Sequence, residues 1–337
     1  MLGALKRRLM PKGGRRAWNR LRNRLVRRVT TRRMAEDLRR LGLAEGDLVC
    51  VHSSLSGVGY LVRGADTVID ALLTVVGERG TVMMPTFSGG NSTYRYVTGA
   101  PPPFDPRTAE ATTGTLPERF RHYPGVLRSL HPTHSVAARG PLAEELLRGH
   151  EDSETPFGDH TPYGRLGPLG GKVLLLNSNG NSLLHRTQEE VGWPNLFREG
   201  RFTLQVVAPG GVRTVSTAVH GPGFCHSVLL PGKGEGELRF IHLVWYALQF
   251  VFMEPDRQEF EGLHPDVARE LEERQRWLTQ QGVVRLGPAG YGQAALLDAA
   301  RFSRRIGDDL RAHFAVHRSR YDLPRLQTLA ATRSPHQ

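Results

Sequence analysis

The sequence predicts an α/β fold in which helices and a sheet form layers. Short apolar runs at residues 48–52, 81–84 and 172–176 are typical of strands. Segments with a helical period lie before the first run and between the first two. This strand–helix–strand order indicates an α/β layer architecture.

Caps and periodicity mark the elements of the first half. Thr30 is placed to cap a helix that runs to Leu41 and ends at Gly42. After the strand at 48–52, Gly64 opens a second helix and Gly77 ends it. The other elements expected in this half are a strand at 81–84, a long loop at 89–113, a helix at 116–122, a strand at 135–138 and a helix at 142–148.

The second half starts with a buried strand at 172–176 and a polar turn, after which Ser182 caps a helix. The apolar segment 238–254 is shorter than the ~20 residues of a membrane-spanning helix, so we expect a core or subunit-interface helix. The sequence therefore leaves open whether the chain forms a homo-oligomer. The other expected elements are a hairpin at 202–207 and 212–217, a helix at 265–281, a strand at 283–286, a helix near 296–302 and a tail without pattern after 318.

Composition is that of an ordinary globular protein. We divide the 337 residues into an extension (1–33), a body (34–318) with an apolar insert at about 229–263, and a tail (319–337). Cys50 lies in an apolar run and Cys225 is far away in sequence, so no disulfide framework is indicated. No cleavable signal peptide is visible, and we expect a cytoplasmic, reducing location.

Positive charge is concentrated in the extension. Residues 1–33 hold 13 Lys or Arg and no acidic residue, so residues 34–337 carry −1 of the net +12. Trp18, Leu21, Leu25 and Val29 recur at helical spacing, which predicts a basic amphipathic helix suited to an anionic membrane surface. A poorly ordered extension, or a start at Met34, is the alternative. We expect a chain that starts at Met34 to stay folded. We expect no nucleic acid as a partner.

Three clusters of hydroxyl and imidazole side chains adjoin strand-like runs. They lie at residues 51–55, 84–88 and 131–136. Because sites in α/β proteins gather at the carboxyl ends of strands, we expect these clusters to form one active-site wall.

Histidine is the natural base for a reaction near neutral pH. His185 is placed one turn into its helix, and Glu189 at i+4 could orient the imidazole and raise its pKa. The alternative interpretation is that His185 and Glu189 are an ordinary pair of side chains on the helix surface. His131 and His134 lie close together, but no third ligand is nearby in sequence, so we expect no metal. Buried histidines satisfied by backbone groups are the other interpretation of this pair.

Several motifs in register resemble the aminoglycoside 3-N-acetyltransferase family. The matching stretches are residues 51–59, 67–73, 80–87, 104–108, 130–138, 162–166, 171–176 and 184–185. The resemblance implies a layered α/β/α sheet of that family's type, acetyl-CoA as co-substrate without a metal, and an amino group of an amino sugar as acceptor. It implies direct transfer in a ternary complex. An acyltransferase of cell-surface glycan or secondary-metabolite assembly and a catalytically silent binding module remain alternatives.

The resemblance also implies roles for individual residues. His185 would be the base, with Glu189 as its partner, while His134 and His131 would bond the thioester carbonyl or shape the acceptor pocket. Residues that would line the pantetheine arm are Ser53, Ser54 and Leu55, with Thr86 and Ser135 as weaker candidates. The chain departs from the family where acidic residues are usual, since Asn179 and Gln188 stand there. Fewer carboxylates predict weak activity on the usual aminoglycosides.

Overall fold

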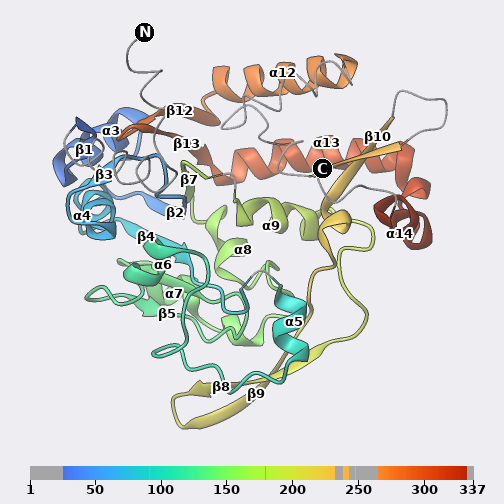
Figure 1. Ribbon diagram of the computed structural model, residues 1–337, viewed down its shortest axis with the longest axis horizontal. Helices are drawn as coiled ribbons and strands as arrows, with labels where there is room; N and C mark the ends of the chain where they lie inside the picture. The colour runs from blue at the N-terminus through green and yellow to red at the C-terminus, as the bar shows by residue number, and fades with distance from the viewer. Residues whose placement is uncertain are drawn as a thin grey trace, which may run out of the picture.

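A seven-stranded mixed sheet lies at the centre of the computed structural model, which describes residues 26–90, 92–178, 180–231, 238–242, 247 and 265–331 (Figure 1). Its strand order is β12-β13-β7-β2-β4-β6-β5. Three central strands are parallel: β2 (Leu48–Ser53), β4 (Thr81–Pro85) and β7 (Lys172–Leu176). The flanking strands are antiparallel: β6 (Val136–Arg139) and β5 (Leu127–Arg128) beyond β4, and β13 (Gly292–Asp298) and β12 (Val284–Ala289) beyond β7.

Both faces of this sheet are covered. On β2, Val49 and Val51 belong to one apolar core and Cys50 to the other, because successive strand residues point to opposite faces. The first core is completed by α3 (Thr31–Leu41), α4 (Ala65–Val76) and α6 (Thr115–Phe120). The second is completed by α7 (Ala143–Leu147), α8 (Pro162–Leu166), α9 (Ser182–Glu190) and α13 (Ala299–His317). The predicted α/β/α layering is confirmed.

The caps expected for the first helix are present. The Thr30 hydroxyl accepts a hydrogen bond from the Arg33 backbone N–H at 3.2 Å. Gly42 ends α3 at a φ of 107°, a left-handed conformation that favours glycine, and its N–H bonds the Arg39 carbonyl at 3.0 Å. These contacts satisfy backbone groups at the two ends of α3.

Smaller elements surround the sheet. The predicted hairpin is present as β8 (Phe202–Ala208) and β9 (Gly211–Thr217), and it extends away from the sheet at the bottom of Figure 1. The loop expected at 89–113 contains a short helix, α5 (Thr93–Thr98). The others are β1 (Arg28–Val29), β3 (Tyr60–Leu61), η1 (His150–Asp152), η2 (Gly223–His226), β10 (Ser227–Pro231), β11 (Leu238–His242), α12 (Pro265–Gln280), η3 (Arg318–Tyr321) and α14 (Leu323–Ala331).

Three predictions for the C-terminal third are wrong. Residues 238–242 of the expected apolar helix form strand β11, paired with β10, while the rest of 238–254 lies outside the described residues except Ala247. Leu296 lies in β13 rather than in a helix, because a short apolar run buried on both faces resembles a helix in sequence. Residues 318–331 of the expected tail form η3 and α14, and their apolar side chains Tyr321 and Leu326 are buried in the core.

The folded body begins before the predicted boundary at residue 34. Arg28–Val29 pairs with Tyr60–Leu61, and the Val29 side chain is fully buried. Val29 thus belongs to a strand and not to the expected basic helix; Trp18, Leu21 and Leu25 lie outside the described residues. No helix within the described ranges is long and apolar enough to cross a membrane. Contact of residues 1–33 with an anionic membrane surface stays a prediction.

A chain that starts at Met34 should therefore be less stable than one that starts at Val26. It loses the burial of Val29 and the Thr30 cap, which together contribute roughly 2–4 kcal/mol to the free energy of unfolding. Urea denaturation of both chains and of the full chain measures this difference. Equal midpoints for the two truncated chains would contradict the assignment of residues 28–33 to the body.

Candidate active site

Polar side chains meet where the three parallel strands end. Strands β2, β4 and β7 share this edge of the sheet. The cluster at 131–135 precedes strand β6 rather than following it. Strand β6 is antiparallel to β4, however, and its first residue, Val136, pairs with Pro85 at the end of β4. The reversed direction of β6 therefore brings His131 and His134 to the same edge.

A cavity of about 250 Å³ opens at this edge. It is lined by Val51, His52, Ser53, Pro85, Phe87, Thr113, Pro117, Ser178, Gly180, Asn181, Ser182 and His185. Ser53 and His185, two predicted site residues, therefore share one cavity. The Ser54 hydroxyl instead bonds the Ser56 hydroxyl at 2.8 Å, and Leu55 packs against the core below α4. Of the three candidates for the pantetheine arm, Ser53 alone is among the lining residues.

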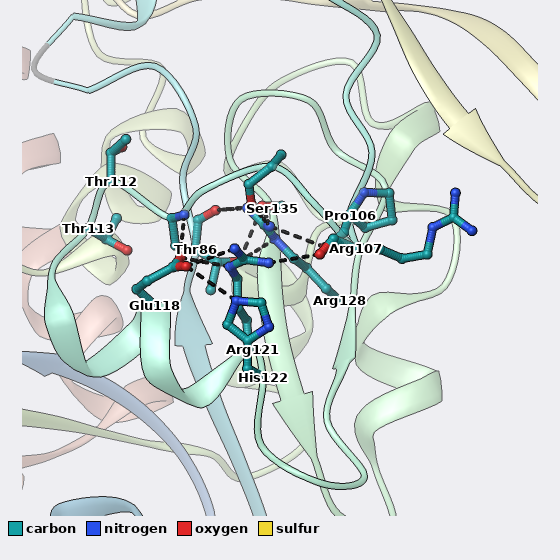
Figure 2. A network of polar contacts seen from close by, with 12 residues as sticks. Thr86, Pro106, Arg107, Thr112, Thr113, Glu118, Arg121, His122, Arg128 and Ser135 are labelled. Carbon is teal, nitrogen blue, oxygen red and sulfur yellow. Dashed lines mark hydrogen bonds and ion pairs between the residues drawn. The ribbon is translucent and has the colours of Figure 1, made fainter. Parts of the chain in front are cut away.

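Thr86 and Ser135, two predicted donor-binding residues, both contact a buried arginine. Both are fully buried, and Arg128 Nε donates to each hydroxyl at 3.1 Å (Figure 2). Arg128 Nη2 also donates to the Thr86 carbonyl at 2.7 Å, and Nη1 to the Pro106 and Ala109 carbonyls. Burial lowers the pKa of Arg128 to about 10, and these acceptors compensate the desolvated guanidinium. The two hydroxyls hold this buried cation and are not among the residues that line the cavity.

The His185 ring contacts Gln188, at i+3 on α9, while Glu189, its predicted partner, contacts His220. Gln188 Oε1 lies 2.9 Å from His185 Nδ1 and 3.0 Å from Nδ1 of His226. The Gln188 side chain therefore links the two imidazoles through Nδ1 of each ring.

Glu189 pairs with a histidine that the sequence motifs did not single out. Its Oε1 lies 2.8 Å from His220 Nε2 and accepts from the Phe157 N–H at 3.2 Å, while Thr155 donates to Oε2. Burial raises the pKa of Glu189 to about 7, although the hydrogen bonds from Thr155 and Phe157 favour the ionised form. Burial lowers the pKa of His220 well below its usual value.

His131 and His134 are buried beside this group. His131 Nδ1 accepts from the backbone N–H groups of Thr133 and His134, at 3.3 and 3.0 Å. The His134 ring packs against Phe87 at 4.5 Å between centroids, next to the cavity. Burial lowers the pKa of His131 to about 3 and that of His134 well below its usual value, so both are neutral. His131 therefore fits the interpretation of a buried histidine satisfied by backbone groups.

The tertiary structure also gathers histidines far apart in sequence. One ring nitrogen from each of His185, His220 and His226 lies within 4.8 Å of the others, a group of donors that could hold a metal ion. Proximity in sequence could not have found it, because His220 and His226 lie 35 and 41 residues after His185. His52 was in a recognised motif, but its contact with the Ser182 N–H at 3.3 Å was not foreseen.

A second cavity, of about 680 Å³, adjoins Glu189. It is lined by Asp152, Ser153, Glu154, Thr155, Gly158, Asp159, His160, Arg186, Glu189, Glu190 and Phe197. Its wall is acidic, but much of the charge is paired within the chain. Arg186 bonds Asp159 and lies 4.0 Å from Glu190, and Asp152 lies 2.8 Å from Arg213.

Comparison with known proteins gives a consistent result. The family model described as aminoglycoside 3-N-acetyltransferase matches residues 50–308. Aminoglycoside N(3)-acetyltransferase IX of Micromonospora chalcea is 39% identical over 174 residues, which is 48% of this chain and 62% of that protein. The alignment thus spans less than two thirds of that relative's length.

Solved structures match over more of the chain. AAC-IIIb in a binary complex with CoASH has a TM-score of 0.62 and 27% identity, and the match covers 85% of this chain and 97% of that one. AAC-VIa bound to sisomicin has a TM-score of 0.61 and 26% identity, with 84% and 98% covered.

The buried histidines should make the protein sensitive to acid. Burial lowers the pKa of both His52 and His131 from 6.5 to about 3. Between those values the unfolded chain binds protons that the folded protein does not, so the free energy of unfolding falls as pH falls below about 6.5. Each such group contributes on the order of a few kcal/mol across this window.

Replacing His131 with Asn should make this pH dependence shallower. The Asn oxygen can accept the same backbone N–H groups without titrating. Urea denaturation at several pH values between about 5 and 8 measures the slope, and His122→Asn, at an exposed position, is the control. An unchanged slope in His131→Asn would show that His131 does not contribute to the acid sensitivity.

Proposed function

Because the chain belongs to the aminoglycoside 3-N-acetyltransferase family, we propose that it transfers an acetyl group from acetyl-CoA to an amino group of an amino sugar. The observation that carries this proposal is the position of His185. Its imidazole lines the 250 Å³ cavity, and its Nδ1 lies 2.9 Å from Gln188 Oε1. A histidine beside the reacting groups is a usual general base for acyl transfer to an amine.

The donor is assigned to the 250 Å³ cavity. The Ser53 and Ser182 residues on its wall offer hydroxyl and backbone groups to the amides of a pantetheine arm. The similar structure of AAC-IIIb contains CoASH, which supports the same class of donor here. The acceptor is assigned to the neighbouring acidic cavity, on the other side of α9.

Direct transfer in a ternary complex fits the state of the thiols. Burial raises the pKa of Cys50 well above its usual range and that of Cys225 to about 11. A buried thiol that keeps its proton is a poor nucleophile, so an acyl-cysteine intermediate is disfavoured. The amine instead attacks the thioester carbonyl, His185 accepts a proton from the attacking nitrogen, and the C–S bond breaks.

Donor binding is the first test. Millimolar CoA should raise the melting temperature of the full chain by a few degrees, because a ligand that binds only the folded state stabilises it. Ser53→Tyr, which fills the cavity wall, should reduce the shift, whereas Ser216→Tyr on the exposed hairpin should not. No shift in folded wild-type protein would overturn the proposed function.

His185→Ala should lower the turnover of acetyl-CoA with an amine by roughly 10²–10⁴, the usual effect of losing a proton-transferring group. The thermal shift with CoA should remain, because Ser53 and Ser182 still line the donor cavity. Release of the CoA thiol, followed with a thiol reagent, gives the rate. If the variant keeps near-normal turnover while His134→Ala abolishes it, the role belongs to His134.

The acceptor should be less cationic than a typical aminoglycoside. Gln188 provides no charge, and Arg186 already pairs with Asp159 beside the acceptor cavity, so attraction for a polycation is reduced. We expect a lower kcat/KM for sisomicin than for glucosamine. Arg186→Gln should narrow this difference, because it frees the carboxylate of Asp159. Efficient acetylation of sisomicin by the wild type would contradict the expectation.

A further inference from the structure

Three histidines from separate parts of the chain form a triangle beside α9. His185 lies on α9, His220 follows β9, and His226 ends η2. Their ring centroids are 5.5, 4.9 and 5.3 Å apart, and one nitrogen from each ring lies within 4.8 Å of the other two. Nitrogens that share one zinc ion at about 2.0–2.1 Å lie about 3.4 Å apart, a spacing that small rotations of the three rings would reach.

The segment that carries two of these rings is fixed against the rest of the fold. The backbones of His220 and Phe197 are paired in a β-bridge, and the Gly221 N–H bonds the Leu196 carbonyl at 2.7 Å. The His226 side chain is buried. A ligand set that is already in place spends little conformational entropy when it binds an ion.

Each ring of this histidine triangle also has an oxygen partner. Glu189 Oε1 lies 2.8 Å from a ring nitrogen of His220. Gln188 Oε1 lies 2.9 Å from a ring nitrogen of His185 and 3.0 Å from one of His226. Metal-binding histidines almost always contact a carboxylate or a carbonyl oxygen in addition to the ion, and these oxygens fix the rings. The carboxylate of Glu189 would also offset part of the cost of placing a dication in a buried site.

We propose that the histidine triangle binds a divalent transition-metal ion of the zinc class, and that the bound ion inhibits acetyl transfer. Three imidazoles suit such ions, whereas Mg²⁺ and Ca²⁺ prefer oxygen ligands. The inhibitory part rests on the proposed function, and the site itself does not. Because His185 lines the 250 Å³ cavity assigned to the donor, an ion bound to it lies beside the proposed reaction. A cation on this imidazole opposes its protonation and so weakens it as a base.

Metal binding is tested first, without any substrate. Equilibrium dialysis of the untagged full chain should find about one tightly bound Zn²⁺ per chain and no comparable binding of Mg²⁺. Glu189→Gln should weaken zinc binding by roughly 10–100-fold, the usual effect of losing an oxygen partner. His220→Gln and His226→Gln each remove a ligand and should weaken it by about 100-fold or more.

The matched control is a second histidine pair, on α13. His313 and His317 lie at i and i+4, with ring centroids 4.9 Å apart. His317→Gln should leave zinc binding by the triangle unchanged. Loss of binding in His317→Gln but not in His220→Gln would place the ion on α13 and overturn the inference. Unchanged binding in both His220→Gln and His226→Gln would also overturn it. The melting temperature without metal verifies that each variant is folded, and if His226→Gln is not, His220→Gln decides.

Inhibition is tested by following a labelled acetyl group from acetyl-CoA to glucosamine. Saturating Zn²⁺ should slow this transfer at least about tenfold, and a chelator should restore it. His220→Gln, compared with its own rate without metal, should need about 100-fold more zinc for the same inhibition, whereas His317→Gln should respond like the wild type. Zinc that binds the triangle without slowing transfer would overturn the inhibitory role. If the wild type binds zinc but transfers no acetyl group in its absence, the proposed function and the inhibitory role fail, and the metal site stands.

Discussion

Burial of both faces of the central sheet is the constraint on which the rest of the structure depends. Strands β2, β4 and β7 place apolar side chains alternately into two cores, so polar groups on these strands can be solvated or bonded only at the strand ends. Because the three strands are parallel, their ends meet at one edge. The antiparallel direction of β6 adds the 131–135 segment to that edge, which concentrates the polar chemistry of the molecule there.

At this edge α9 separates two environments. Gln188 and Glu189 are neighbours in sequence and project about 100° apart around the helix. Gln188 is fully buried and its oxygen contacts His185 and His226, while Glu189 contacts His220 and lines the acidic cavity. Two neighbouring residues of one helix thus contact different histidines.

Arg128 illustrates how a polar cluster can be structural. Its guanidinium is desolvated, and acceptors from the end of β4, from Ser135 and from the 106–109 loop surround it (Figure 2). The loop that carries Thr113 to the cavity wall is fastened to the sheet in this way, and the Thr113 hydroxyl bonds the Pro85 carbonyl at 2.6 Å. The hydroxyls of Thr86 and Ser135 take part in this attachment.

The sequence by itself determined the layered fold and most element bounds, because apolar periodicity and caps are local signals. It identified Ser53 and His185, which lie on the cavity wall. Only the tertiary structure decided which side chains are partners. His220 reaches Glu189 across 31 residues, Arg128 reaches Thr86 across 42, and β11 and α14 owe their form to the surfaces they pack on. Hydrogen-bond partners and burial depend on contacts between distant segments, and no local pattern encodes them.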